Sequence, residues 1–379
     1  MSGLHPRVGP DHMVGRDHAR LAVARNLGAV DEIEDRVAGA EFQDHPAVRA
    51  FGLLILDAAC AVHDGRDLVG WRNLRRHGCR LEHLLAALRH ALLGARDHLD
   101  HAFVGLLRVL AEGEDAVLLI HGLTGTPAEM RYIAKNLLKQ GFSVACPQLA
   151  GHCGTVSYLK RSKWQDWYQS MEVAFEALKK EHNRVFVSGL SMGALIALKL
   201  AENKGARVDG VGLLSTTFFY DGWNMPRLKR ALLLPIVLNT PLKHFMSWEE
   251  TPPYGIKCER TRALVHAVLE NRDAMASEKV GIFNTPAVTI KESTRLIKTA
   301  RRGLPKVISP TLIVHATEDD MASVKNAHLV ANRISSRKVE TYFVDDSYHV
   351  LTLDKRKNDI ALRMAEFFKK CAAEQIAAV

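Results

Sequence analysis

From residue 111 onward, short apolar runs alternate with longer amphipathic segments, and this alternation limits the possible folds more than any other feature. Apolar runs with almost no charge are typical of strands buried on both faces. The expected strands are 116–122, 142–147, 184–189, 208–216, 310–316 and 339–344, and the expected helices are 127–141, 163–180, 192–203, about 323–333 and 354–377. Strands and helices in this order predict a mostly parallel sheet that is flanked by helices. In such sheets, ligands bind outside the carboxyl ends of the strands.

The first 110 residues differ in composition from the rest of the chain. They contain ten of the 18 histidines and one serine, and they lack threonine, lysine and tyrosine. Leucines at helical spacing predict an amphipathic helix within 80–112. We therefore expect two parts, a mainly helical or poorly ordered extension at 1–110, whose function is left open, and an α/β domain at 111–379.

Charge and hydropathy exclude several classes of protein. No apolar run reaches the roughly 18–20 residues of a membrane span, and the first residues lack the apolar core of a signal peptide. We therefore expect a cytoplasmic protein without stable membrane insertion. The net charge of +9 is interleaved with acidic residues and does not form a basic stripe, so no nucleic-acid partner is expected. Six scattered cysteines without a CxxC pair favour free thiols, and neither a metal nor a cofactor is expected.

The segment "VFVSGLSMGALIALKLA" runs from an apolar strand through Gly-Leu-Ser-Met-Gly directly into a helix. The pattern G-x-S-x-G is informative in this strand-to-helix context, because the glycines allow close packing around a sharp turn that exposes the serine. The helix N-terminus then favours negative charge that develops next to the serine. A helix-capping serine is the alternative interpretation. We predict that Ser191 is a nucleophile.

A serine hydroxyl needs a neighbouring base, and the partners are expected in the order serine, acid, histidine. His349 lies after the last expected strand, where its imidazole can fold back over Ser191. Three acidic residues follow the strand that ends near Ala316. We choose Asp319 as the acid, because three residues beyond the strand its carboxylate can reach the histidine, and we keep Asp320 in reserve.

The segment "IHGLTGTP" follows the first expected strand of the α/β domain. A backbone N–H at this position can pair with the N–H after the nucleophile to bind an oxyanion. The expected oxyanion donors are therefore the backbone N–H groups of Leu123 and Met192. No G-K-[ST] follows, so the glycines do not form a phosphate-binding P-loop.

Taken together, these motifs resemble the α/β-hydrolase superfamily, in particular its small bacterial carboxylesterases and monoacylglycerol lipases. The resemblance covers about 111–370 and rests on "HGLTG" at His121–Gly125, "GLSMG" at Gly189–Gly193 and "HVLTLD" at 349–354. Two departures could alter the pocket wall: Gly151–Gly154 reads Gly-His-Cys-Gly where the family usually has Gly-His-Gly, and "MASV" replaces V/I-P after the acid. Residues 1–110 have no counterpart in the family.

About 95 residues separate the strands at 208–216 and 310–316, which is too long for a bare loop. We expect a helical cap at about 217–305, rich in Phe, Trp, Met and Leu, over the nucleophile. An apolar cap favours a small uncharged ester as the substrate, and we predict a serine esterase for short to medium acyl chains. The alternatives are a monoacylglycerol lipase, a thioesterase or amidase with the same triad, or a non-catalytic ligand-binding protein. The physiological ester and the oligomeric state are left open.

Overall fold

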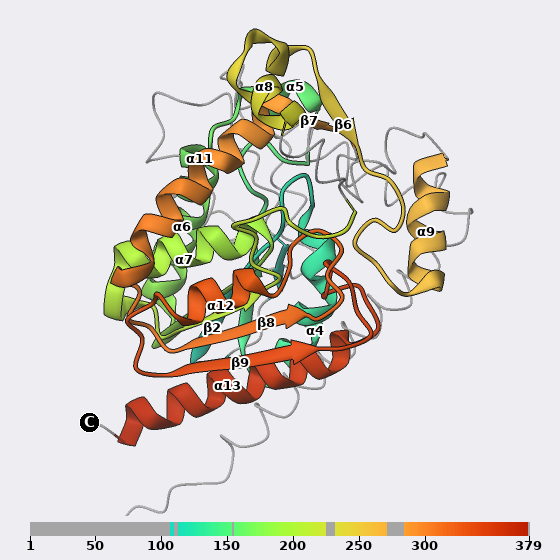
Figure 1. The fold of residues 1–379 in the computed structure, drawn as a ribbon. Coiled ribbons are helices and arrows are strands. Elements are labelled where there is room, and N and C mark those ends of the chain that lie inside the picture. Colours follow the sequence, from blue (N-terminus) through green and yellow to red (C-terminus); the bar gives the residue numbers. More distant parts are fainter. Residues whose placement is uncertain (1–106, 110–112, 154, 225–231, 271–283, 378–379) are drawn as a thin grey trace, which may run out of the picture. The chain divides into compact units, whose positions relative to one another are not determined.

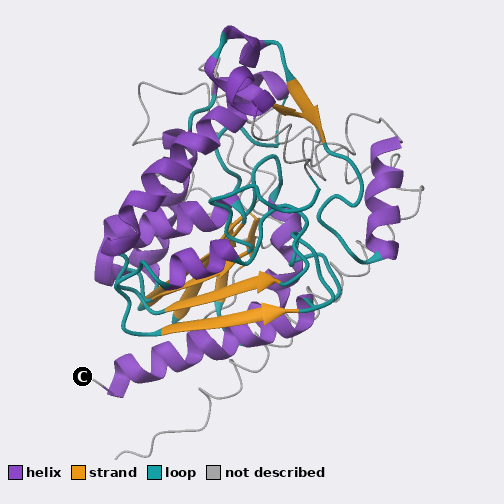
Figure 2. Ribbon diagram, in the orientation of Figure 1, coloured by secondary structure: helices purple, strands orange, loops and turns teal. Residues whose placement is uncertain are grey.

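A seven-stranded sheet forms the centre of the computed structural model, which describes residues 107–109, 113–153, 155–224, 232–270 and 284–377 (Figures 1 and 2). The strand order is β1-β3-β2-β4-β5-β8-β9; β1 is antiparallel to β3, and the other neighbours are parallel. The strands are β1 (Leu107–Val109), β2 (Asp115–Ile120), β3 (Ser143–Cys146), β4 (Arg184–Leu190), β5 (Gly210–Leu214), β8 (Thr311–Ala316) and β9 (Val339–Val344). The predicted mostly parallel sheet is confirmed.

Helices cover both faces of this sheet (Figure 1). One core cluster joins the sheet to α6, α7, α11 and α12, and the other joins the opposite face to α4 and α13. The helices are α4 (Arg131–Lys139), α5 (Val156–Arg161), α6 (Trp164–Glu181), α7 (Met192–Lys204), α11 (Ala287–Gly303), α12 (Lys325–Ala331) and α13 (Lys357–Ala377). Because both faces are covered, the central strands β2, β4, β5 and β8 are mostly apolar and buried, as the sequence indicated, whereas the edge strand β9 carries Glu340 and is partly exposed.

The strand β2 illustrates how one apolar run supplies two cores. Successive side chains of a strand point to opposite faces. Leu118 and Ile120 belong to the cluster with α6 and α7, whereas Val117 and Leu119 belong to the cluster with α4 and α13. All four are fully buried, and each such side chain contributes about 1.5–3 kcal/mol relative to exposure. The central strands therefore form a rigid support for the loops at their carboxyl ends.

The helix predicted within 80–112 is wrong at its end, because Leu107–Val109 forms the strand β1. Leu107 pairs with Cys146 and Val109 with Val144, at the edge of the sheet. Three residues are too few to distinguish a helical from a strand period, and pairing with the open edge of β3 satisfies backbone groups that a helix would satisfy internally. The predicted domain boundary at residue 110 thus separates β1 from the other strands of its sheet. The rest of the predicted N-terminal helix lies outside the described residues.

A further group of elements lies between β5 and α11 in the chain, at the top and at the right of Figure 1. It contains α8 (Leu234–Asn239), a 3-10 turn at Pro241–His244, β6 (Ser247–Glu249), α9 (Glu259–Glu270) and β7 (Asn284–Pro286). β6 and β7 pair antiparallel, so this part is not purely helical. The helix α11, which the sequence also assigned to the cap, packs against α6 and α7. The extent of the cap at 217–305 stays a prediction.

Within the ranges that the structure describes, no helix is both long enough and apolar enough to cross a membrane.

Candidate active site

Ser191 lies in a sharp turn between β4 and α7. Its backbone has φ 55° and ψ −112°, a conformation that non-glycine residues rarely adopt. The glycines on either side are required by space: a Cβ at Gly189 would lie 2.2 Å from the carbonyl carbon of Gly193, and one at Gly193 would lie 2.3 Å from the Ile120 oxygen. Ser191 N–H donates to the carbonyl of Leu214 at 2.8 Å. The turn is therefore held against the carboxyl ends of β2 and β5.

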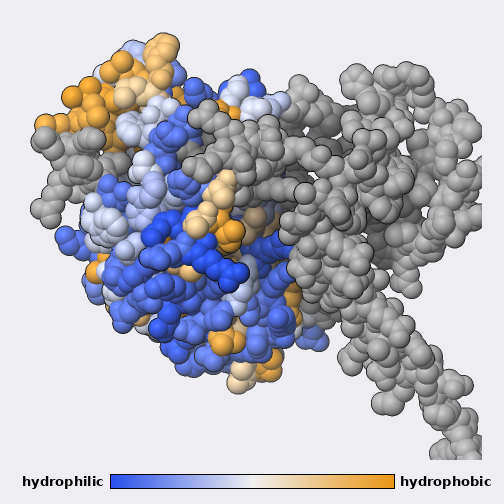
Figure 3. Space-filling model, turned by 90° about the vertical axis from the view of Figure 1, so that its right-hand side faces the viewer, coloured by the Kyte–Doolittle hydropathy of each residue, from blue (hydrophilic) through white to orange (hydrophobic). Residues whose placement is uncertain are grey.

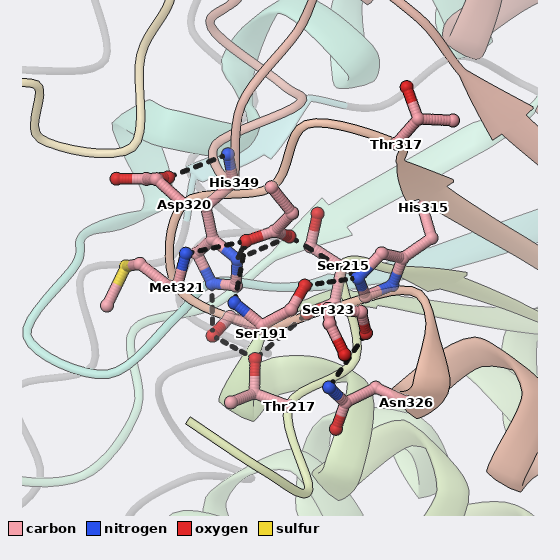
Figure 4. Close-up of polar contacts among 12 residues, drawn as sticks. Ser191, Ser215, Thr217, His315, Thr317, Asp320, Met321, Ser323, Asn326 and His349 are labelled. Carbon is pink, nitrogen blue, oxygen red and sulfur yellow. Dashed lines mark hydrogen bonds and ion pairs between the residues drawn. The ribbon is translucent and has the colours of Figure 1, made fainter. Parts of the chain in front are cut away.

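The three side chains that the sequence proposed as a triad lie in hydrogen-bonding contact, and Figure 4 labels two of them, Ser191 and His349. The Nε2 atom of His349 lies 2.9 Å from Ser191 Oγ. Its Nδ1 atom lies 2.8 Å from Oδ2 and 3.0 Å from Oδ1 of Asp319. Both His349 and Asp319 are buried. The arrangement is that of a hydroxyl, a base and a carboxylate that orients the base.

Asp319, rather than Asp320, contacts the imidazole. Asp319 Oδ1 also accepts the backbone N–H groups of Met321 at 2.9 Å and Ala322 at 2.8 Å, which fix the carboxylate plane. The Asp320 carboxylate turns instead to the backbone N–H of His349 at 3.3 Å. The neighbouring carboxylates therefore make different contacts with one residue: Asp319 orients its ring, and Asp320 accepts from its backbone.

The charges of the site shift the pKa values in opposite directions. Burial alone would raise the pKa of Asp319, but the His349 imidazole and the Ala322 N–H outweigh burial and hold this pKa below its ordinary value. Burial would likewise lower the pKa of His349, but the negative charge and hydrogen bond of Asp319 outweigh it and raise this pKa above the usual 6.5. The environment thus favours an ionised carboxylate and stabilises the imidazolium that forms when the histidine accepts a proton.

The loop that carries Leu123 lies next to the nucleophile. A Cβ at Gly122 would lie 3.8 Å from Ser191 Cβ and 3.7 Å from the Leu190 oxygen. Thr124, the next residue after Leu123, has a positive φ of 63°. Met192 is the first residue of α7, whose opening N–H groups have no partner within the helix. The structure therefore brings the loop of Leu123 and the start of α7 to the same side of the sheet, although the role of the two N–H groups stays a prediction.

Two carboxyl groups that the sequence reasoning missed hold this loop. Glu129 accepts the N–H of Gly122 through Oε1, and Glu250, which follows β6, accepts the hydroxyl of Thr124 at 3.2 Å. Desolvation raises the pKa of each carboxyl to about 7, and the two also repel one another. No motif marked them, because an isolated glutamate in a sequence resembles any solvated residue.

Two further missed residues contact the proposed triad. Thr217 donates to the carbonyl of Ser215 at 3.0 Å, so its oxygen, 3.2 Å from Ser191 Oγ, offers that hydroxyl a second acceptor (Figure 4). His315 is fully buried on β8; its Nε2 lies 2.7 Å from the Ala322 carbonyl and 3.4 Å from Asp319 Oδ2. Burial lowers its pKa. The sequence signal that could have identified His315 was a histidine inside the apolar run "TLIVHA".

The family model described as "Serine aminopeptidase, S33" matches residues 111–356, a range that includes Ser191, Asp319 and His349. This chain is an α/β-hydrolase of that family. Among the residues that the structure describes, no cluster of three His, Cys, Asp or Glu side chains is arranged to hold a metal ion in this hydrolase.

Curated relatives and solved structures agree with the assignment of this chain to the α/β-hydrolases. A protein named thermostable monoacylglycerol lipase from Bacillus sp. (strain H-257) is 31% identical over 260 residues, covering 69% of this chain and 92% of its own. A protein named carboxylesterase from Bacillus subtilis (strain 168) is 26% identical over 259 residues, covering 68% and 94%. A solved structure from work on the metagenome-derived lipolytic enzymes LipS and LipT has a TM-score of 0.59 and 26% identity, and covers 70% of this chain and 97% of that one.

Proposed function

We propose that this hydrolase cleaves carboxylic esters by acyl transfer through Ser191, His349 and Asp319. The observation that carries the proposal is the continuous set of contacts from Ser191 Oγ through the imidazole to the Asp319 carboxylate. The family match and the names of the curated relatives, a monoacylglycerol lipase and a carboxylesterase, support the same class of reaction.

The geometry supports a two-step mechanism. His349 Nε2 accepts the hydroxyl proton of Ser191 while Oγ attacks the ester carbonyl carbon. Asp319 stabilises the imidazolium and keeps Nδ1 protonated, so that Nε2 is the free base. The backbone N–H groups of Leu123 and Met192 bind the oxyanion, and each donor of this kind typically contributes about 2.7–4 kcal/mol. The imidazolium then protonates the leaving alcohol, and water activated by the same histidine releases the acid from the acyl-enzyme.

The proposed substrate is a small ester with a short to medium acyl chain. Large apolar side chains are exposed on the elements between β5 and α11, where hydrophobic residues gather at the top of the molecule in Figure 3. They include Leu233 and Ile236 at α8, and Leu242 and Phe245 in the next turn. Exposed apolar patches of this kind suit contact with an apolar ligand. They favour an ester with an acyl chain over a charged substrate.

A series of p-nitrophenyl esters, from acetate to palmitate, tests the proposal. We expect the highest kcat/KM among the short to medium chains, and Ser191→Ala should reduce kcat by at least about 10³-fold, because the nucleophile is lost. Ser188→Ala is the matched control: this serine lies on β4, close to the turn that carries Ser191, and is fully buried, but its hydroxyl lies outside the contacts of the site. Equal activity of the wild type and Ser191→Ala would refute the nucleophile.

The alternative that a specific comparison favours is a monoacylglycerol lipase, because the relative of that name is 31% identical. Comparing kcat/KM on a monoacylglycerol and on the p-nitrophenyl ester of the same acid separates the two substrates. A matched thioester belongs in the same assay, since the triad can act on either leaving group. Higher kcat/KM on the thioester would replace the esterase proposal with a thioesterase. Absence of fluorophosphonate labelling at Ser191 would instead favour a non-catalytic ligand-binding protein.

A further inference from the structure

Asp354, the last residue of "HVLTLD", has no role in the mechanism above, yet its carboxylate is the centre of a hydrogen-bond network. Its side chain is 1% exposed. Both oxygens accept two backbone N–H groups each, from Tyr348 at 2.7 Å, Lys257 at 2.8 Å, Cys258 at 2.8 Å and Lys355 at 2.9 Å. These donors belong to three parts of the chain: the loop of His349, the approach to α13, and the residues between β6 and α9. Four such bonds use the full acceptor capacity of a carboxylate.

The Gly255–Cys258 segment, which lies between β6 and α9, also contacts the other side of His349. The N–H of Val350 donates to the Gly255 carbonyl at 2.8 Å. Gly255 has φ 70°, and a Cβ there would lie 3.1 Å from the Cβ of His349 and 2.9 Å from Val350 Cγ2. The N–H groups immediately before and after the histidine are therefore both held through this segment, one directly and one through Asp354.

The side chain of Lys257, in the same segment, joins the loops of the proposed acid and base. Its ammonium contacts Glu318, which precedes Asp319, at 2.6 and 2.8 Å. It also lies 3.1 Å from Asp346 Oδ1 in the loop of His349, and 5.7 Å from the centre of the Tyr348 ring. The lysine thus bridges the two loops whose side chains must meet at the hydrogen bond between Asp319 and His349.

We infer that Asp354 and Lys257 are positioning residues, through which the Gly255–Cys258 segment holds His349 in line between Ser191 and Asp319. The inference rests on the proposed function. The loop of His349 is outside the sheet, so it lacks the ladder of backbone bonds that fixes a strand, and Asp354 supplies equivalent fixed acceptors. Because the segment continues from β6, the position of the imidazole is coupled to that of the elements between β5 and α11. A displacement of about 1 Å in such a group costs about 100-fold in rate.

The first test is Asp354→Asn, which keeps the size of the side chain but leaves one oxygen to accept and turns an NH₂ group toward two N–H donors. We expect kcat per active site, titrated with a fluorophosphonate, to fall about 10- to 100-fold on a p-nitrophenyl ester, with KM within about threefold. The resonance of the His349 Nδ1 proton should shift or broaden. Asp209→Asn is the control, because Asp209 is also buried and accepts the N–H of Val185 at 2.8 Å, at the opposite end of the strands.

The second test uses Lys257→Gln, a change near the surface that leaves the core intact. Lys338 is a closely matched control: it contacts Glu374 at 2.8 Å through both oxygens and lies 5.6 Å from the ring of Phe367. The lysine side chains are 24% and 21% exposed, respectively. We expect Lys257→Gln to lower kcat about two- to fivefold, Lys257→Arg to restore it, and Lys338→Gln to leave it unchanged, with equal changes in Tm for the two glutamine variants.

Two outcomes would count against the inference. Asp354→Asn with a per-site kcat within twofold of the wild type and an unchanged imidazole resonance would overturn the role of Asp354. Equal kcat for Lys257→Gln and Lys338→Gln would overturn that of Lys257. Ester hydrolysis that persists in the Ser191→Ala variant would refute the proposed function alone. The inference would still be testable, because the imidazole resonance reports the position of His349 without substrate.

Discussion

The most informative single substitution is Asp319→Asn, because the surrounding N–H groups determine which way the new amide must turn. Oδ1 accepts two backbone N–H groups, at 2.9 and 2.8 Å, whereas Oδ2 contacts the imidazole of His349 at 2.8 Å. An asparagine keeps its oxygen at the two N–H donors and therefore presents its NH₂ group to His349. Nδ1 must then accept, Nε2 carries the proton, and Ser191 faces a nitrogen that is not a base.

This tautomer change sets the expected magnitude. In a serine protease with the same geometry, the equivalent substitution reduces kcat about 10⁴-fold. At 1.36 kcal/mol for each factor of ten, this corresponds to about 5.4 kcal/mol of lost transition-state stabilisation. We expect a loss of the same order here, because the imidazole of His349 is buried and its Nδ1 atom contacts both carboxylate oxygens of Asp319.

The assay is the pH dependence of kcat/KM on a p-nitrophenyl ester. In the wild type, the activity should fall as the pH falls through a pKa above 6.5, because Asp319 raises the pKa of the base. Asp320→Asn is the matched control: Asp320 contacts the histidine only through its backbone N–H, so we expect a loss of less than about tenfold.

The reasoning would be refuted if Asp320→Asn lost as much activity as Asp319→Asn. It would also fail if Asp319→Asn stayed within tenfold of the wild type across the pH range.

Two further substitutions test packing and charge around the nucleophile. Gly193→Ala should lower the free energy of unfolding by about 3 kcal/mol or more, since its Cβ would meet the Ile120 carbonyl. Gly205→Ala meets no atom within 4 Å and adds only the strain of a positive φ of 55°, so it should cost less; equal urea midpoints would contradict this. Glu129→Gln should be more stabilising at pH 8 than at pH 5, by up to about 3 kcal/mol, because a pKa raised from 4.5 to about 7 means that the Glu129 carboxyl costs no stability below about pH 4.5 and that its cost grows between about pH 4.5 and pH 7. Urea unfolding at the two pH values measures the difference, and a pH-independent effect would exclude ionisation of Glu129 as its cause.

Local signals in the chain were sufficient for the parallel strands of the sheet and for the proposed triad. Each expected strand from 116 to 344 appears within a few residues, because the central strands are buried on both faces and therefore read as apolar runs. Ser191 was found from the flanking glycines, which are required because a Cβ at either position would collide with nearby backbone atoms. His349 and Asp319 were found because the order of strands along the chain places their loops at the same sheet edge.

The residues that support the site could not be found in the same way, because their roles come from neighbours distant in sequence. Glu250 and Thr124 are 126 residues apart, and Asp354 and Lys257 are 97 apart. Nothing in the local sequence distinguishes Glu250 from a solvated acid, and the motif "HVLTLD" marked Asp354 without indicating what it contacts. For a similar reason β1 was mistaken for a helix, since its three residues become a strand only by pairing with β3.

The sequence by itself thus determined the layered α/β architecture and the chemical groups of the site, because burial periodicity and steric demands at glycine are properties of adjacent residues. Only the tertiary structure decided that Asp319 orients the imidazole, that Asp320 accepts its backbone N–H, and that Asp354 gathers four N–H groups around the loop of His349. Those contacts depend on the relative positions of loops at the edge of a sheet, and hydrogen bonds form or fail over distances of a few tenths of an ångström.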